Sequence, residues 1–262
     1  WKLHEDGREG FAIWSETRDG DGDKIEFADG VEPAPPTVDE LAKWLHDYPN
    51  SQWGYDGGWR DRCKTHFTVA LKALCKTASE RDEWPPDRVS TVLQAAWNNE
   101  ESLKESWPDL GEYMDDAPDH VLQEVEHALG MWMQEVAKVV GGSKPLFFRI
   151  AERLADLEYG GEIPQETNAF GRAINHPAGQ VTEAILRWWY SSEPKEGGGI
   201  TQEVAPLLAR LCDRQQPKYR YARVILCRNL VSLFRADEAW AKSHLLPLLS
   251  WDGEQNETVD AW

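Results

Sequence analysis

The side chains that come closest to a metal site by type and spacing are His120, Glu124 and His127. On a helix they share one face, and Glu124-x-x-His127 is the spacing with which a carboxylate-bridged di-iron centre takes a ligand pair. Such centres need that pair twice, with two further inward carboxylates, and the sequence contains it once. The exposed side of an amphipathic helix explains the same residues. A metal-dependent enzyme is therefore only a second alternative here.

Other reaction chemistries lack the residues that they require. Asp19, Asp21 and Asp23 alternate with glycine like the start of an EF-hand loop. Lys24 and Gly30 stand where calcium binding needs a glycine and a bidentate glutamate, so a solvated turn is favoured. The sequence also holds no G-x-S-x-G, no phosphate-binding glycine loop and no G-x-G-x-x-G. We predict no catalytic residue, no metal and no cofactor in this chain.

The cysteine spacing indicates neither a disulfide framework nor a zinc site, because none of the four cysteines forms a C-x-x-C pair. Cys63 and Cys75 are predicted to share one helix, about 18 Å apart, which is too far for a bridge. Cys212 and Cys227 fall on neighbouring predicted helices and could touch. Buried, reduced thiols of a cytoplasmic protein are the expected state.

The composition is that of a folded and strongly acidic protein. The 262 residues are 41% hydrophobic and include 14 Trp, whose rings bury enough surface to argue against disorder. A net charge of −18 argues against binding to nucleic acid or to an anionic membrane, and no apolar run is long enough to cross a bilayer. Because the chain begins at Trp1 and stops at Trp262 within an apparent new helix, we expect a segment of a longer protein.

One part of the chain has the opposite charge balance. Residues 170–251 contain 11 Lys and Arg against 7 Asp and Glu. Within them, four arginines fall inside about 140° of a single predicted helix, opposite its leucines: Arg220, Arg223, Arg228 and Arg235. Such a basic stripe can dock on the acidic helices of the same chain or stay solvated, and it can also bind a partner. Both interpretations stay open.

A second candidate surface is aromatic. Trp53, Tyr55 and Trp59 lie in the predicted loop SQWGYDGGW, where glycines interrupt any apolar periodicity. Aromatic side chains on a loop can form a recognition surface for another protein. Packing of the same rings over the core is the other interpretation.

The elements that position these residues are predicted to be helices. Apolar residues recur at three- and four-residue spacing from Thr37 onward, and Thr37 and Glu40 have the spacing of a capping box. Gly141 and Gly142 end the longest predicted helix, and Pro247 bends or ends the last one. The predicted helices cover residues 37–46, 63–78, 85–97, 118–140, 146–157, 181–189, 204–212, 219–235 and 237–249.

The resulting fold class is all-α. Consecutive amphipathic helices joined by short turns predict an irregular helical repeat, a HEAT- or TPR-like α-solenoid, with a multi-helix bundle as the other architecture. Residues 1–36 form a short irregular or β-like N-terminal segment. Residues 37–160 form an acidic helical region, and residues 161–262 form a helical region with the basic helix, continuous with the preceding one.

Four segments carry a resemblance to a known family: NHPAGQVTEAILRWWY, PLLARLCD, YRYARVILCRNLVSLFRAD and WAKSHLLPLLSW. Together, from Asn175 to Trp262, they resemble a helical region of large bacterial sirtuin-like proteins of antiphage defence. In those proteins the region follows an NAD-hydrolysing domain. The resemblance implies a helical part that restrains, assembles or triggers that domain. The glycine-rich loop and the Asn-Asp and His positions of a sirtuin are missing from this chain, so only the accessory role carries over.

We therefore expect a non-catalytic scaffold or sensor region of a bacterial antiphage defence protein, located in the cytoplasm. Its expected partners are proteins: a viral trigger, a neighbouring protomer in a homo-oligomer, or the effector domain. The first alternative is a stand-alone acidic helical-repeat adaptor. Its acidic face, around Asp109 to Glu126, would bind a basic protein.

Overall fold

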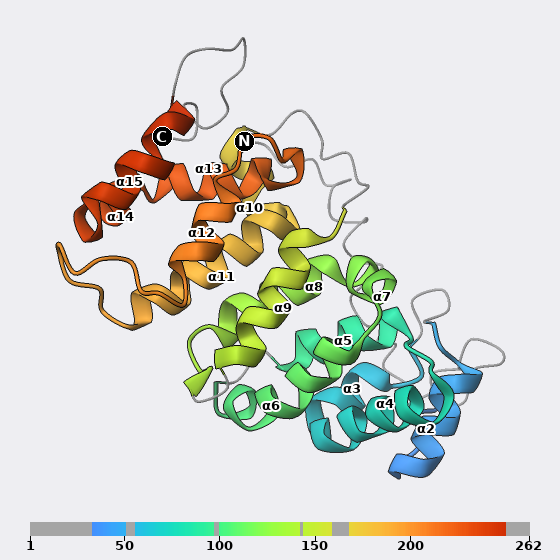
Figure 1. Ribbon diagram of the computed structural model, residues 1–262. Coiled ribbons are helices and arrows are strands. Elements are labelled where there is room, and N and C mark those ends of the chain that lie inside the picture. Colours follow the sequence, from blue (N-terminus) through green and yellow to red (C-terminus); the bar gives the residue numbers. More distant parts are fainter. Residues whose placement is uncertain (1–32, 51–55, 97–99, 142–143, 159–167, 250–262) are drawn as a thin grey trace, which may run out of the picture. The chain divides into compact units, whose positions relative to one another are not determined.

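The computed structural model describes residues 33–50, 56–96, 100–141, 144–158 and 168–249 (Figure 1). Within these ranges every regular element is a helix, so the all-α prediction is confirmed for them. The chain divides into two compact units, Trp1–Glu32 and Pro33–Trp262. Of residues 1–36, which were expected to be irregular or β-like, residues 1–32 lie outside the described residues, and residues 33–36 belong to no helix or strand.

The described helices begin soon after the boundary between the two units. In chain order they are α2 (Val38–Asp47), α3 (Trp59–Thr65), α4 (Phe67–Arg81), α5 (Pro86–Ala96), α6 (Glu100–Asp116), α7 (Asp119–Glu124), α8 (Glu126–Val136), α9 (Lys144–Asp156), α10 (Ala169–Asn175), α11 (Pro177–Ser191), α12 (Ala205–Leu211), the 3₁₀ turn η2 (Pro217–Tyr219), α13 (Arg220–Arg228), α14 (Leu230–Ala236), α15 (Glu238–His244) and the 3₁₀ turn η3 (Leu246–Leu249). No helix in these ranges combines the length and the apolar composition needed to cross a bilayer.

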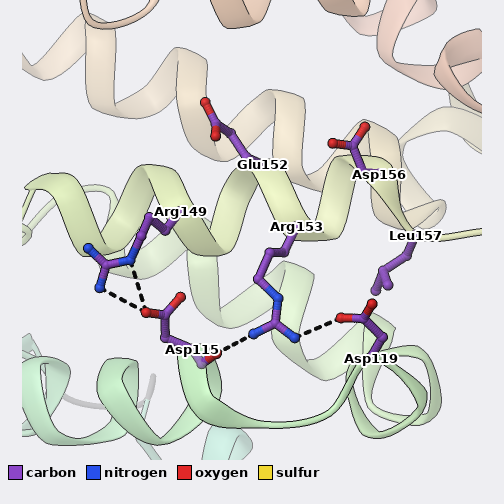
Figure 2. A pocket seen from close by; sticks show the side chains of 7 residues that line it. All are labelled: Asp115, Asp119, Arg149, Glu152, Arg153, Asp156 and Leu157. Atoms are coloured by element: carbon purple, nitrogen blue, oxygen red, sulfur yellow. Dashed lines mark hydrogen bonds and ion pairs between the residues drawn. The ribbon is translucent and has the colours of Figure 1, made fainter.

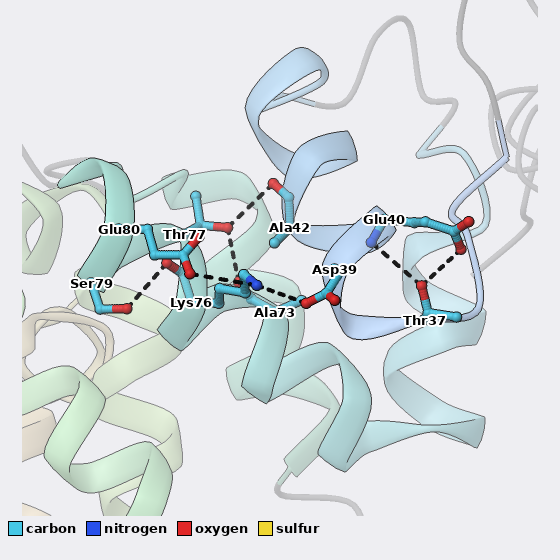
Figure 3. Close-up of polar contacts among 9 residues, drawn as sticks. All are labelled: Thr37, Asp39, Glu40, Ala42, Ala73, Lys76, Thr77, Ser79 and Glu80. Atoms are coloured by element: carbon cyan, nitrogen blue, oxygen red, sulfur yellow. Dashed lines mark hydrogen bonds and ion pairs between the residues drawn. The ribbon is translucent and has the colours of Figure 1, made fainter.

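The start of α2 follows the predicted cap. Thr37 has an extended backbone, and its hydroxyl oxygen accepts a hydrogen bond from the backbone N–H of Glu40 at 3.4 Å. The Thr37 hydroxyl in turn donates to the Glu40 carboxylate at 2.7 Å (Figure 3). In a full capping box the glutamate would accept from the backbone N–H of the cap residue instead. Local sequence therefore sets the beginning of the helix, with a variant of the expected bonding.

Polar contacts between α2 and α4 accompany the apolar packing of these two helices. The ammonium group of Lys76 lies 2.7 Å from the carboxylate of Asp39 (Figure 3). The buried hydroxyl of Thr77 lies 2.8 Å from the carbonyl oxygen of Ala73, within its own helix, and 3.4 Å from that of Ala42 on α2. The surface ion pair adds little stability, on the order of 0–1 kcal/mol, so the apolar contact between the helices carries the packing.

The main helix contacts advance along the chain. Helix α2 packs on α4, α3 on α5, α5 on α8, α6 on α9, α8 and α9 on α11, and α11 on α13. Helix α11 has the most buried surface, because nearly every residue from Pro177 to Trp189 is enclosed. Contacts that link elements close in sequence are typical of helical repeats, although a bundle is also built this way.

Three predicted helices are interrupted. The helix predicted over 63–78 is two helices, α3 and α4, divided at His66, so Cys63 and Cys75 do not share one helix. The helix predicted over 118–140 is divided at Val125 into α7 and α8. The one predicted over 219–235 is divided at Asn229 into α13 and α14. The three- and four-residue spacing of apolar residues continues across each break, which is why the pattern did not reveal it.

The break at Asn229 has an identifiable cause. Its side-chain amide donates to the carbonyl oxygen of Ile225 at 2.9 Å, within the helical ladder. Its side-chain oxygen accepts from the Tyr190 hydroxyl at 3.0 Å. An asparagine that bonds to the preceding turn competes with regular helical bonds and bends the helix.

Two helices were not predicted. Helix α10 occupies residues between two predicted elements, and α6 is the longest described helix, with 17 residues. Pro108 lies inside α6 and argues against a helix there, yet its side chain is exposed, so the ring points away from the core. Close packing also requires Gly111, where an added Cβ would lie 2.9 Å from Leu146 of α9.

Candidate functional site

A charged pocket of about 400 Å³ lies where α9 passes the end of α6 and the start of α7 (Figure 2). Its lining is almost entirely ionisable: Asp115, Asp119, Arg149, Glu152, Arg153, Asp156 and Leu157. Two turns of α9 supply most of these side chains, since their spacing of three and four residues places them along one side of a helix. Acidic and basic groups at this density could form a reaction site or a set of inter-helix braces.

The arginines of the pocket are engaged with α6 and with the segment that follows it. Both Nε and Nη2 of Arg149 donate to one carboxylate oxygen of Asp115, at 2.9 and 2.8 Å. That bonding raises the pKa of Arg149. Arg153 donates to the carbonyl oxygens of Asp115 and Ala117, and its Nη2 lies 2.7 Å from the carboxylate of Asp119 (Figure 2). The two arginines therefore hold the α6–α7 connection against α9.

The opposite end of the pocket is tied to a later part of the chain. One Asp156 carboxylate oxygen accepts a hydrogen bond from the Tyr219 hydroxyl at 2.6 Å. Arg210 and Lys218 form ion pairs with the same carboxylate at 3.2 and 3.5 Å. Burial, followed by the hydrogen bond to Asp156, raises the pKa of Tyr219 to about 12. Asp156 thus connects α9 with α12 and η2.

This geometry favours bracing over catalysis. A general acid or base must present its proton-carrying atom to a substrate, within about 2.6–3.2 Å. The carboxylates of Asp115, Asp119 and Asp156 are already bonded to basic or hydroxyl groups of other elements. The pocket can therefore fix three chain segments in register, and its charge is largely neutralised internally.

The basic residues predicted to form a partner surface do not act together. Arg223 is half-buried, and its Nη1 donates to the carbonyl oxygens of Asp213 at 2.7 Å and Gln216 at 3.0 Å. Burial lowers the pKa of Arg223, so the two carbonyl oxygens offset a cost of desolvation. Arg223 therefore fastens the turn before α13, and its role as a partner contact stays a prediction.

The other three arginines are exposed. Arg220 and Arg228 lie on α13, and the Arg228 guanidinium stands 5.3 Å from the ring centre of Phe170. Arg235 lies on α14, beyond the break at Asn229. The predicted single stripe is therefore divided between two helices, with Arg235 beyond the break.

Of the three aromatic candidates, the structure describes only Trp59. Trp53 and Tyr55 lie outside the described residues. Trp59 begins α3, has no exposed surface and stacks on Trp44 with ring centres 6.3 Å apart. Its indole N–H donates to the carbonyl oxygen of Arg88 at 3.1 Å. Trp59 is therefore a core residue, and its interpretation as part of a recognition surface is wrong.

Arg88 is a structural anchor that was not predicted. Its side chain is 1% exposed, and its three nitrogen atoms donate to the carbonyl oxygens of Tyr48, Asn50 and Asp56 at 3.0–3.1 Å. The guanidinium also lies over the ring of Trp44 at 4.6 Å. A sequence signal did exist, because Arg88 stands four residues before Val92 and so on the apolar face of α5.

The candidate metal ligands do not converge. His120 and Glu124 lie on α7 and His127 on α8, with Val125 between the helices, and all three side chains are exposed. His127 Nδ1 lies 3.0 Å from the side-chain nitrogen of Gln180. Across the described ranges, no group of three His, Cys, Asp or Glu side chains is placed to hold a metal ion. His120, Glu124 and His127 therefore do not form the metal site that the metal-enzyme alternative requires.

The cysteines agree with the expectation of buried thiols. All four lie among the described residues, and none forms a disulfide. Cys63, Cys212 and Cys227 are buried, and Cys75 is partly exposed. Burial raises the pKa of the Cys75 thiol to about 11 and that of Cys212 to about 12. These thiols are weak nucleophiles near neutral pH.

Comparison with known proteins does not assign a family to this chain. No protein-family model, no curated protein and no solved structure matches it. The resemblance of Asn175–Trp262 to the helical region of sirtuin-like defence proteins stays a prediction.

Proposed function

We propose that this chain is a non-catalytic helical scaffold or sensor region, which acts through contacts with other protein domains. The observation that supports this proposal is that the charged side chains of the pocket join different parts of the fold. Arg149, Arg153 and Asp156 each bridge from α9 to another part of the fold. A scaffold needs such bridges, because it must keep its binding surfaces in a fixed relation to one another.

The resemblance supplies the biological setting of this proposal. In a sirtuin-like defence protein, the helical region would restrain, assemble or trigger an NAD-hydrolysing domain. Binding of a viral protein or of a neighbouring protomer would favour one arrangement of the helices over another, and so shift the effector domain toward its active state. Helices that contact their near neighbours in sequence, as α8, α11 and α13 do, can transmit such a displacement stepwise.

The experiment has two arms. The purified 262-residue chain is incubated with NAD, and the products are separated by chromatography; we expect no hydrolysis. The complete protein encoded by the same gene is then compared with a variant that lacks residues 169–249, with NAD measured in cells before and after phage infection. We expect the deletion to abolish the infection-dependent fall in NAD or to make it constitutive. Hydrolysis by the chain itself, or an unchanged response after the deletion, would overturn the proposal.

An acidic adaptor is the second candidate, and one observation favours it. Asp109, Glu112 and Asp116 are exposed and lie three and four residues apart on α6, so they form a continuous acidic edge. This edge would bind a basic protein without any effector domain. Affinity that falls steeply between 50 and about 300 mM salt, and that is lost on neutralising these three residues, would support the adaptor.

A further inference from the structure

We propose that a second pocket, between the end of α11, the loop after it and α14, binds an acidic side chain of a protein partner. The inference rests on the proposed function in one respect, because it names the partner chemistry of a protein-binding scaffold. The pocket measures about 300 Å³. The residues that matter for binding are Tyr190, Pro194, Lys195, Ser232 and Arg235, with Glu196 at the same site.

Backbone bonds hold the two sides of this pocket together. The N–H of Gly197 donates to the carbonyl oxygen of Arg235 at 2.9 Å, and the N–H of Gly199 donates to that of Ala236 at 2.9 Å. Both glycines have positive φ values, 69° and 82°, which other residues adopt only with strain. These bonds cover carbonyl groups at the C-terminal end of α14, whose partial negative charge would otherwise repel an anion. The loop is thus shaped and fixed against the helix.

The charge of the pocket is positive in a strongly acidic protein. Lys195 and Arg235 have exposed side chains, and neither forms an ion pair with any residue in the described ranges. Glu196 is the opposing charge, which leaves one net positive charge at the site. The nearby carboxylate of Asp237 is used internally, since it accepts from the backbone N–H of Ile200 at 3.3 Å and of Trp240 at 2.9 Å. Two basic groups that line one pocket, neither of them in an ion pair within the described ranges, favour a carboxylate ligand.

The remaining walls favour a side chain over a small inorganic anion. Tyr190 is half-buried, and its hydroxyl already donates to Asn229 at 3.0 Å, so the ring offers mainly apolar surface. Pro194 and Ala236 add further apolar surface. A glutamate with its methylene groups, flanked by an apolar residue, matches both the charge and the walls.

The test uses the complete 262-residue chain and a defined probe. Acetyl-Leu-Glu-Leu-amide is titrated into ¹⁵N-labelled protein, and the backbone amide signals of Gly197 and Gly199 are followed by NMR. Acetyl-Leu-Gln-Leu-amide and inorganic phosphate form the two comparison titrations. The variant Lys195→Gln/Arg235→Gln removes the proposed contacts. Lys43→Gln/Arg60→Gln is the matched control, because it removes the same charge from exposed side chains on α2 and α3.

We expect saturable shifts with the glutamate peptide in the wild type and in the control variant. Binding should weaken about 5- to 10-fold in the Lys195/Arg235 variant, since two charged contacts are lost. Glu196→Gln should bind about 2- to 3-fold more tightly, because a like charge is removed from the site. Equal binding of the glutamine peptide, saturation by phosphate with no response to the peptide, or absence of any shift would each overturn the inference.

The outcomes also separate this inference from the proposed function. A chain that hydrolyses NAD by itself would refute the scaffold role and leave the peptide titration unaffected. A chain that fails to bind the peptide, while its deletion still alters NAD loss on infection, would refute the pocket and leave the scaffold role standing. Thermal unfolding of the Lys195/Arg235 variant should match the wild type within about 2 °C, because exposed side chains without partners contribute little to stability.

Discussion

The buried guanidinium of Arg88 gives the most informative perturbation of the fold. Its three nitrogen atoms satisfy the carbonyl oxygens of Tyr48, Asn50 and Asp56, and it lies over the ring of Trp44. Arg88→Met keeps the aliphatic bulk and removes all three donors. We expect the chain to remain folded, with a clearly lower free energy of unfolding.

The expected magnitude follows from two opposing effects. Each carbonyl oxygen left without a partner costs about 1–3 kcal/mol, which sets an upper limit of about 9 kcal/mol for three. Burial lowers the pKa of Arg88, which shows that the charged side chain loses hydration in the fold, and methionine avoids that cost. The backbone around Asn50 is also exposed, so its carbonyl can rehydrate. We expect a net loss of about 2–4 kcal/mol.

Urea unfolding followed by circular dichroism measures this loss. Arg81→Met is the matched control, because Arg81 is exposed at the end of α4 and should change the free energy of unfolding by less than about 0.5 kcal/mol. The loss in free energy of unfolding for Arg88→Lys should lie between those for Arg81→Met and Arg88→Met, since one ammonium group cannot reach three separated acceptors. If Arg88→Met lay within about 1 kcal/mol of the wild type, the three bonds would not anchor this region.

Three further predictions follow from buried groups. Burial lowers the pKa of His176 from its ordinary value of 6.5 to about 4. As the pH drops from about 6.5 to 4, this histidine takes up a proton in the unfolded chain but not in the folded one, so the free energy of unfolding falls. His176→Asn keeps a capping acceptor and should reduce the loss between pH 7 and 5 by about 1–2 kcal/mol, measured by urea unfolding at both values. Gly130→Ala places a Cβ 2.2 Å from the side-chain oxygen of Gln180 and 2.9 Å from the Gln180 Cβ, and should cost about 1–3 kcal/mol in the free energy of unfolding. In a Gln180→Ala background this cost should be smaller but not abolished, because the Cβ of residue 180 remains; an equal cost in both backgrounds would refute the contact with the amide group. Cys212 should resist iodoacetamide at pH 8 until the chain is unfolded. Modification of Cys212 itself in the native protein, located by peptide mass spectrometry, would contradict its burial.

The parts of the fold that sequence could predict are those with local causes. Thr37 begins α2 because its hydroxyl reaches the N–H of Glu40, three residues away. Pro86 occupies the first turn of α5, where its missing N–H costs nothing. The apolar stripe of α11 was predicted from residue spacing, and its members are buried. In each case the interacting residues lie within one or two helical turns.

Helix α6 was missed although its apolar residues have helical spacing. Its buried residues Leu103, Trp107, Leu110 and Met114 recur at spacings of four, three and four, which is the pattern of a helix face. Pro108 and the many acidic residues obscured it. Because the proline ring is exposed, the helix loses one hydrogen bond and keeps its packing. The apolar spacing of a helix is therefore compatible with an internal proline whose ring is exposed.

The charged pocket could not be predicted, because its pairs depend on how helices pack. Arg149 and Asp115 are 34 residues apart, and Tyr219 and Asp156 are 63 residues apart. In the sequence each is one of many charged residues at ordinary helical spacing. For Arg88 the sequence showed only its place on the apolar face of α5, because its acceptors are backbone oxygens that no sequence pattern distinguishes.

The placement of these braces constrains how a displacement could pass from one group of described helices to the next. The main contacts between the helices before residue 158 and those after residue 168 are made by α11, which packs on α8 and α9, and by η2, which packs on α9. The second connection is centred on the Asp156 carboxylate, with Lys218 and Tyr219. A partner that moves α13 or α14 must therefore displace the fully packed α11 or break the polar contacts of Asp156. Moving a packed helix disturbs many apolar contacts at once, whereas ion pairs and a hydrogen bond can exchange with water at low cost. The Asp156 cluster is accordingly the point at which two arrangements of these helices would differ most easily.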